Sequence, residues 1–132
     1  MIQNAALTDS EWVLIQIIWE NQPCTLRSIC NEVNKKHAWS RHAVISFLKR
    51  METKKTIAVQ EASPHKLYRA LISKEETVLQ EAKDVLDRAF EGNPMLMVSY
   101  LANDKAFSEE ELEELVQILR NGKEAQHDAT DT

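Results

Sequence analysis

Cysteine and histidine are side chains that commonly bind metals or take part in catalysis, and their spacing here supports neither use. Cys24 and Cys30 are six residues apart, which is not the Cys-x-x-Cys spacing of metal or redox sites. Cys30 falls within an apolar helical stripe, so we predict a buried thiol there. The four histidines show no metal-ligand pattern, and the sequence has no glycine-rich phosphate loop or nucleophile motif. We therefore predict that the protein is not an enzyme and uses no metal and no cofactor.

Basic and hydroxyl side chains follow a different pattern between residues 39 and 50. Apolar residues of this segment recur at helical spacing, which places the polar residues on the opposite face of the helix. Basic and hydroxyl groups on an exposed helical face are the types that bind DNA phosphates and base edges. With two basic residues further along the chain, the predicted DNA-binding residues are Trp39, Ser40, Arg41, His42, Ser46, Lys49, Arg50, Lys66 and Arg69.

These residues are expected to play different parts. Residues at the start of the helix and along its outer face are candidates for base contacts: Arg41, His42, Ser46 and Lys49. Ser40, at the helix N-terminus, is expected to face a phosphate, because helix N-termini favour anions. Further phosphate contacts are expected from Arg50, Lys54 and Lys55, and from His65, Lys66 and Arg69, which could also reach the minor groove.

Three helices joined by short turns must position these side chains. Thr8 and Glu11 form a capping box at the start of a helix over residues 8–21, Thr25 can cap a second helix, and a third covers 40–54. Residues 56–62 and 66–72 then alternate loosely between apolar and polar, which predicts a β-hairpin. Three helices followed by a hairpin form a winged helix-turn-helix, which we predict for residues 1–72.

Three more helices are predicted after this domain. Ser73 to Glu76 and Ser108 to Glu111 have the pattern of capping boxes, and Asn93 with Pro94 can start a short helix between them. We expect helix ends at Gly92 and Gly122. Residues 73–122 are therefore predicted to form a helical dimerisation domain, followed by a polar tail over 123–132. The fold class is mainly α with a small β-hairpin wing.

The middle helix of this second domain, residues 95–102, is apolar on nearly every side and must be enclosed by other parts of a protein. It could pack on the winged domain of the same chain. We favour a two-fold homodimer, because a palindromic DNA site mirrors the symmetry of a protein dimer. The predicted dimer-interface residues are Val85, Phe90, Leu96, Met97, Tyr100, Leu101, Leu112, Leu115 and Leu119.

Composition agrees with this division of the chain. The 132 residues are 43% hydrophobic, with two Gly and three Pro, which favours helices over an all-β fold. The net charge of −5 combines a front part, residues 1–72, at +4 with a remainder at −9, so only the front is suited to a polyanion. No apolar run approaches the ~20 residues of a membrane span, and the N-terminus does not have the pattern of a signal peptide. We expect a cytoplasmic protein with no membrane partner.

Four segments resemble the penicillinase-repressor family: SEWVLIQIIW, WSRHAVISFLKRMETKK, KLYRALIS and SEEELEELVQIL. The resemblance covers residues 7–121 and implies a bacterial, cytoplasmic homodimer that binds operator dyads and represses antibiotic-resistance or copper-export genes. The family's recognition helix falls on Trp39 to Met51, and Arg50 in this segment matches the family's pattern. The family's Thr and Arg of this helix are replaced by Ala43 and Ile45, and the Gly that follows it corresponds to Thr56.

The resemblance also suggests how repression could be relieved. In members that respond to β-lactams, a regulatory protease cuts within the short apolar helix, and the matching bond here is Tyr100–Leu101 in place of Asn-Phe. Members that respond to copper carry a cysteine cluster near the C-terminus. This chain has no cysteine after Cys30, which excludes metal sensing through that cluster.

Two functions are consistent with these observations. The first is a dimeric transcriptional repressor whose partners are double-stranded operator DNA and a second copy of the chain. The alternative is a winged-helix module whose basic face binds an acidic protein. Binding to random-sequence DNA discriminates between them, because phosphate contacts make the affinity depend steeply on salt.

Overall fold

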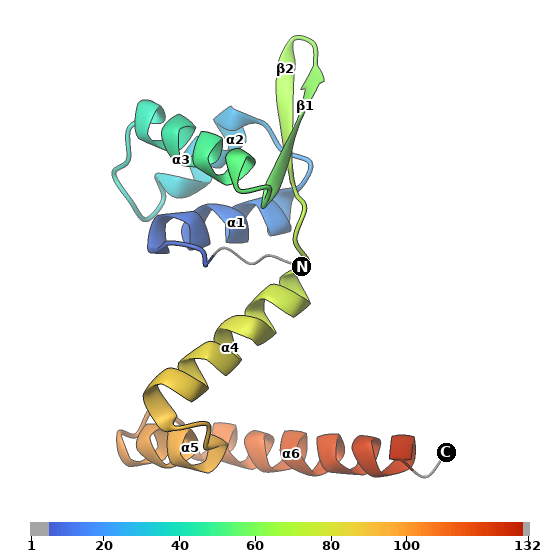
Figure 1. The fold of residues 1–132 in the computed structure, drawn as a ribbon. Coiled ribbons are helices and arrows are strands. Elements are labelled where there is room, and N and C mark those ends of the chain that lie inside the picture. Colours follow the sequence, from blue (N-terminus) through green and yellow to red (C-terminus); the bar gives the residue numbers. More distant parts are fainter. Residues whose placement is uncertain (1–5, 131–132) are drawn as a thin grey trace. The chain divides into compact units, whose positions relative to one another are not determined.

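The computed structural model describes residues 6–130, with side chains described up to residue 122. The chain forms two compact units, Met1–Leu79 and Gln80–Thr132, each of which is described by itself. The first unit has the element order of a winged helix-turn-helix, as predicted (Figure 1). Its elements are α1 (Asp9–Asn21), α2 (Leu26–Val33), α3 (Arg41–Thr53), β1 (Ile57–Ala62) and β2 (His65–Ala70).

The three helices of the first unit begin where their capping residues predict. The Thr8 hydroxyl accepts a hydrogen bond from the Glu11 amide at 3.3 Å, and the Glu11 carboxylate accepts one from the Thr8 amide at 2.9 Å. Thr25 and Ser40 cap α2 and α3 through hydroxyls that accept from the amide three residues later, at 3.2 and 3.0 Å. These bonds satisfy amides that a helix leaves without partners in its first turn.

One apolar core holds the first unit together. Helices α1, α2 and α3 pack on one another, β1 packs on α3, and β2 packs on α1 and α2. Burial removes these side chains from water, which is the main stabilising contribution to a small domain. The buried apolar residues are Leu14, Ile15, Ile18, Cys24, Ile29, Val33, Val44, Leu48, Met51, Ile57 and Tyr68.

The two strands form an antiparallel hairpin, which confirms the predicted wing. Ile57 lies opposite Ala70, and Ala62 lies opposite His65 at the far end. Cys24 extends the pairing at the base, because its amide and carbonyl exchange hydrogen bonds with those of Tyr68, at 3.1 and 2.7 Å. The hairpin is thus attached to the segment between α1 and α2 as well as to β1.

The turn from α3 into β1 contains a residue in the left-handed conformation. Lys55 has φ of 65°, whereas Thr56 is buried and its hydroxyl donates to the Met51 carbonyl at 3.1 Å. The family resemblance had placed the glycine of this turn at Thr56. The residue of this turn that holds the backbone conformation favoured by glycine is Lys55, one position before Thr56.

Lys55→Gly is therefore expected to raise the free energy of unfolding by about 0.5–1 kcal/mol, because relief of left-handed strain exceeds the entropy that glycine adds to the unfolded chain. Urea denaturation followed by tryptophan fluorescence measures this change. Lys49→Gly is the control, since Lys49 lies inside α3, where glycine costs about 1 kcal/mol. A loss of stability in Lys55→Gly would contradict the assigned backbone conformation.

The second unit is entirely helical among its described residues. Its helices are α4 (Lys74–Phe90), whose first residues belong to the first unit, α5 (Pro94–Asn103) and α6 (Glu109–Thr130). Asn93 caps α5 with Pro94 in its first turn, as predicted. Ser108 and Glu111 form the predicted capping box, with exchanged hydrogen bonds of 2.8 and 3.1 Å.

Of the two predicted glycine stops, only one ends a helix. Gly92 follows α4 with φ of 73°, and its amide donates to the Leu86 carbonyl at 3.0 Å. The stop predicted at Gly122 is wrong, because α6 continues to Thr130 and includes most of the predicted tail. A single glycine costs a helix only about 1 kcal/mol, which neighbouring residues can offset.

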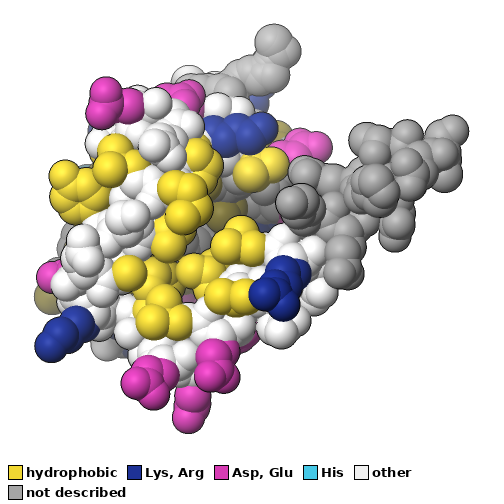
Figure 2. Space-filling view, turned by 90° about the horizontal axis from the view of Figure 1, so that it is seen from below, with side chains coloured by type: hydrophobic (Ala, Val, Ile, Leu, Met, Phe, Trp, Pro, Cys, Tyr) yellow, Lys and Arg dark blue, Asp and Glu magenta, His cyan; other side chains and the backbone are white. Residues whose placement is uncertain are grey.

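The second unit exposes much of its apolar surface. No residue of α4 or α5 is buried, and the exposed fractions are 64% for Met95, 64% for Tyr100 and 56% for Leu119. Figure 2 shows the apolar side chains gathered on the face seen from below, bordered by acidic and basic ones. Of the predicted interface residues, Tyr100, Leu112 and Leu119 are exposed and the others are half-buried: Val85, Phe90, Leu96, Met97, Leu101 and Leu115.

Helices with enough length and apolar character to cross a membrane are absent from the described part of the chain.

Candidate nucleic-acid interface

The outer face of α3 carries four exposed polar residues in one line. His42, Ser46, Lys49 and Thr53 follow one another at intervals of four, three and four residues, opposite the buried face of the helix. We call these four residues the α3 outer stripe. Thr53 was not among the predicted contacts, although the same helical spacing points to it. Its hydroxyl donates to the Lys49 carbonyl at 3.0 Å.

The N-terminus of α3 presents two further exposed groups. Arg41 is the first residue of the helix and is exposed, as is His42 beside it. The Ser40 hydroxyl accepts from the Ala43 amide, so it holds the start of the helix in place. The positive end of the helix dipole and Arg41 together favour an anion here.

Trp39 lies in the turn before α3 and packs against its own protein. Its ring centroid is 5.4 Å from that of Phe47 and 5.0 Å from that of His37. The Arg50 guanidinium lies 5.9 Å from the Phe47 centroid, on the same side of α3. Trp39, predicted as a DNA contact, is therefore half-buried in an aromatic cluster that supports the turn, whereas Arg50 is exposed.

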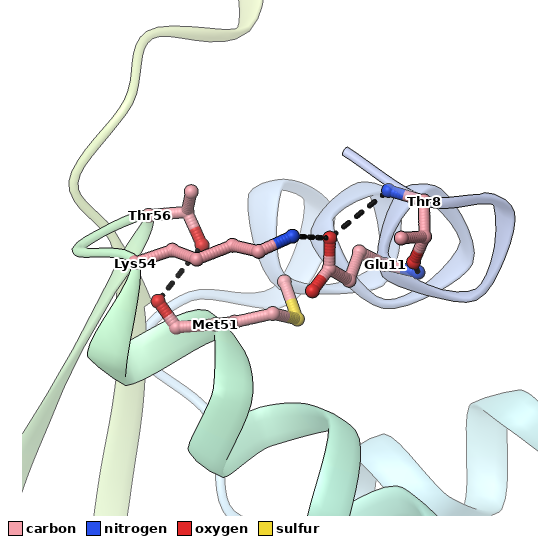
Figure 3. Close-up of polar contacts among 5 residues, drawn as sticks. All are labelled: Thr8, Glu11, Met51, Lys54 and Thr56. Atoms are coloured by element: carbon pink, nitrogen blue, oxygen red, sulfur yellow. Dashed lines mark hydrogen bonds and ion pairs between the residues drawn. The ribbon is translucent and has the colours of Figure 1, made fainter. Parts of the chain in front are cut away.

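Lys54, expected to contact phosphate, instead forms an internal ion pair. Its Nζ lies 2.8 Å from Oε1 of Glu11, whose side chain is fully buried (Figure 3). The same Oε1 accepts the Thr8 amide, while Oε2 has no hydrogen-bond partner among the described residues. Sequence reasoning recognised Glu11 only as a capping residue and missed its pairing with Lys54.

The surroundings of Glu11 favour its charged form. Burial alone would raise the pKa of this carboxyl, but hydrogen bonds from Lys54 and the Thr8 amide, with the Lys54 charge, lower the pKa below its ordinary value. Cys24 shows the opposite case, because burial raises the pKa of its thiol and keeps it protonated. Cys24 is buried as a small apolar group, and Cys30, predicted to be buried, is half-buried against the core.

The hairpin places Lys66 and Arg69, two of its three predicted DNA contacts, on opposite faces. Side chains alternate along a strand, so Lys66 lies on the face of Tyr68, which packs into the core, and Arg69 lies on the other face. Lys66 pairs with Glu61 across the hairpin at 3.8 Å, with both side chains exposed. Such a surface pair contributes little to stability. Lys66 and Arg69 therefore project from opposite faces of the hairpin.

Comparison with known protein families adds the identity of the chain. A model of the penicillinase repressor family matches residues 7–121, which include the winged unit and most of the following helices. The chain belongs to the penicillinase repressor family.

Individual relatives cover nearly the whole chain. The penicillinase repressor of Bacillus licheniformis is 25% identical over 118 residues, which cover 89% of this chain and 91% of that protein. The methicillin resistance regulatory protein MecI of Mammaliicoccus sciuri is 21% identical over 113 residues, or 86% of this chain and 92% of that protein. Among solved structures, AbfR of Staphylococcus epidermidis is similar at 22% identity and a TM-score of 0.47, covering 89% of this chain and 75% of AbfR.

Family membership and fold together establish the general function. Members of this family are transcriptional repressors rather than enzymes, and the winged helix-turn-helix of this chain is the corresponding DNA-binding fold. This family member is a DNA-binding transcriptional repressor.

Proposed function

We propose that the protein represses transcription as a homodimer bound to a palindromic operator, with α3 of each copy in the major groove. The observation that carries the proposal is the α3 outer stripe, whose polar side chains have no packing role in the described structure. In this arrangement Arg41, His42, Ser46 and Lys49 contact base edges, because residues at the start and on the outer face of a recognition helix reach the groove floor.

The apolar residues of α5 and α6 support the dimer. A helix as apolar as α5 is not stable with its side chains in water, and nothing in α4 or α5 is buried within one copy. On α6, Leu112, Leu115, Val116 and Leu119 lie on one face at spacings of three and four residues. A second copy would cover these residues through a two-fold interface.

The regulated genes are proposed from the relatives. Those of Bacillus licheniformis and Mammaliicoccus sciuri are named for penicillinase and for methicillin resistance, so we propose antibiotic-resistance genes as targets and the cytoplasm as the site of action. Metal-export genes are a second target class, suggested by the family resemblance alone.

Relief of repression by proteolysis is a further part of the proposal. Tyr100 and Leu101 lie in α5, and Tyr100 is exposed, with its ring 5.9 Å from that of Phe90. A cut between Tyr100 and Leu101 would separate α6 from the winged unit. The two winged units would then bind their half-sites independently and lose the affinity that a linked pair gains.

Selection of bound duplexes from a random pool, at fixed salt near physiological strength, tests the proposed operator binding. We expect an inverted repeat with half-site centres about one or two helical turns apart. Binding that recovers no motif would contradict the operator proposal. Absence of any salt-dependent binding to DNA would instead favour the winged-helix module that binds a protein partner.

Arg41→Ala is expected to weaken binding to the recovered duplex by about 1–3 kcal/mol, because a bidentate contact to a base is worth about this much. Binding to a random duplex should change much less. Fluorescence anisotropy with both duplexes measures the difference, and Arg27→Ala is the control, since Arg27 is an exposed arginine on α2. An equal loss on both duplexes would assign Arg41 to a phosphate.

A further inference from the structure

The ion pair of Lys54 and Glu11 joins three parts of the winged unit. Glu11 lies in the first turn of α1, Lys54 directly follows α3, and two residues later Thr56 leads into β1. Figure 3 shows the Lys54 side chain extending from the end of α3 to Glu11 on α1. The pair therefore holds the junction between the two elements that we place on DNA.

Packing and the ion pair both fix this junction, and the ion pair adds a directional contact at its end. Val44, Leu48 and Met51 are buried in the close-packed core and hold the body of α3 in place. The Lys54–Glu11 bond is directional, with 2.8 Å between Nζ and Oε1. The Glu11 side chain is fully buried, so water does not replace Lys54 as its partner. Its second oxygen, Oε2, has no partner among the described residues, so Lys54 is the only cation that compensates this carboxylate there.

A small movement at this end of α3 becomes larger at the other end. The 13 residues of α3 span about 20 Å. A tilt of about 5° at Lys54 would displace Arg41 by nearly 2 Å over that length. Hydrogen bonds to base edges tolerate only a few tenths of an ångström, so such a tilt would break them.

We infer that Glu11 and Lys54 are positioning residues for sequence recognition: their ion pair sets the angle at which α3 and the hairpin meet DNA, and Lys54 contacts no phosphate. The inference rests on the proposed contact of α3 with DNA. According to this inference, Glu11 influences which DNA sequence the protein prefers, although it lies on α1 and not in the α3 outer stripe.

The test compares Lys54→Met with wild type on two probes, the duplex recovered by selection and a random duplex, over a range of salt concentrations. The measured quantity is the dissociation constant for the random duplex divided by that for the selected duplex. Partial unfolding weakens both constants equally, so a purely structural role leaves this ratio unchanged. We expect the ratio to fall about tenfold or more, equivalent to loss of at least one base contact, while the salt dependence stays that of wild type.

Two further variants complete the test. Arg50→Met is expected to reduce the salt slope by about 0.9, because the exposed Arg50 is the expected phosphate contact, and this shows that the assay detects such a loss. Lys54→Arg keeps the cation and is expected to restore the ratio. If Lys54→Met binds neither duplex, the double variant Glu11→Gln, Lys54→Met replaces it. The double variant removes the ion pair without leaving a buried carboxylate unpaired, and its new side-chain amide at position 11 can still accept from the Thr8 amide.

Three outcomes overturn the inference. A ratio equal to that of wild type in Lys54→Met or its substitute would leave the pair a purely structural role. A salt slope reduced by about 0.9 would make Lys54 a phosphate contact. If wild type itself recovers no motif, the operator proposal fails and the inference fails with it. If wild type recovers a motif and only the variants give the results above, the inference fails and the operator proposal stands.

Discussion

Lys54→Met is expected to lower the free energy of unfolding of the winged unit by about 3 kcal/mol at pH 7, because it leaves the Glu11 carboxylate buried without its cation. Urea denaturation followed by tryptophan fluorescence measures this unit selectively, since all three tryptophans lie in it. The expected cost is at the low end for buried pairs because the Lys54 side chain is 25% exposed.

Lys35→Met provides a matched control. Lys35 and Glu32 are also 2.8 Å apart, but the Lys35 side chain is 67% exposed and that of Glu32 is 35% exposed. Breaking a surface pair of this kind changes stability by less than about 1 kcal/mol. An equal loss in Lys35→Met and Lys54→Met would show that burial of Glu11 does not strengthen its pairing.

The same variant has an expected pH dependence. In wild type the pKa of Glu11 is lowered from the ordinary 4.5, so its contribution to stability is present above pH 4.5 and is lost as pH falls through the folded-state pKa. Without Lys54, burial acts on Glu11 with less compensation, and the carboxyl takes up its proton at higher pH. The difference between wild type and Lys54→Met should therefore begin to shrink above pH 4.5, where the variant takes up the proton, and shrink further as pH falls through the lowered folded-state pKa of wild type. A difference independent of pH would contradict the assignment to Glu11.

The second large effect is expected from Leu119→Glu, which should convert the proposed dimer to a monomer. Leu119 is 56% exposed in one copy, so a charge at this position changes the stability of the single copy little. At the centre of a dimer interface the same charge would be buried without a partner, which weakens association by about 2 kcal/mol or more, or about 30-fold. Sedimentation velocity at several protein concentrations measures the change.

Gln117→Glu controls for added charge, because Gln117 is exposed on nearly the opposite side of α6. It should leave the mass unchanged, and circular dichroism should show the same helix content in both variants. A Leu119→Glu protein that still sediments as a dimer would place the interface elsewhere. Binding of Leu119→Glu to an inverted repeat should fall to that of a single half-site.

The sequence predicted those features that depend on neighbouring residues. The caps at Thr8, Thr25, Ser40 and Asn93 start their helices in the structure because each needs only an amide two or three residues away. The change from helical to alternating spacing likewise predicted the hairpin, since both periods are visible within a few residues.

Features that depend on distant residues were missed. Glu11 and Lys54 are 43 residues apart, and a capping carboxylate is ordinarily exposed, so only the packed fold brings them together and buries one of them. The end of α6 was misplaced for a different reason, because glycine can either end a helix or lie within it. The predicted DNA contacts and dimer interface stay predictions, although the structure separates Lys66 from Arg69 and turns Trp39 toward Phe47.

The α3 outer stripe also has a consequence for how such repressors diverge. Its four side chains are exposed, so substitutions among them, other than to glycine or proline, change stability by about 0.5 kcal/mol or less. A lineage could therefore acquire a new operator preference through single changes at these positions, with every intermediate protein still folded. Duplicated genes with this scaffold could diverge into regulators of separate promoters, while the caps and core beneath the stripe remain the same.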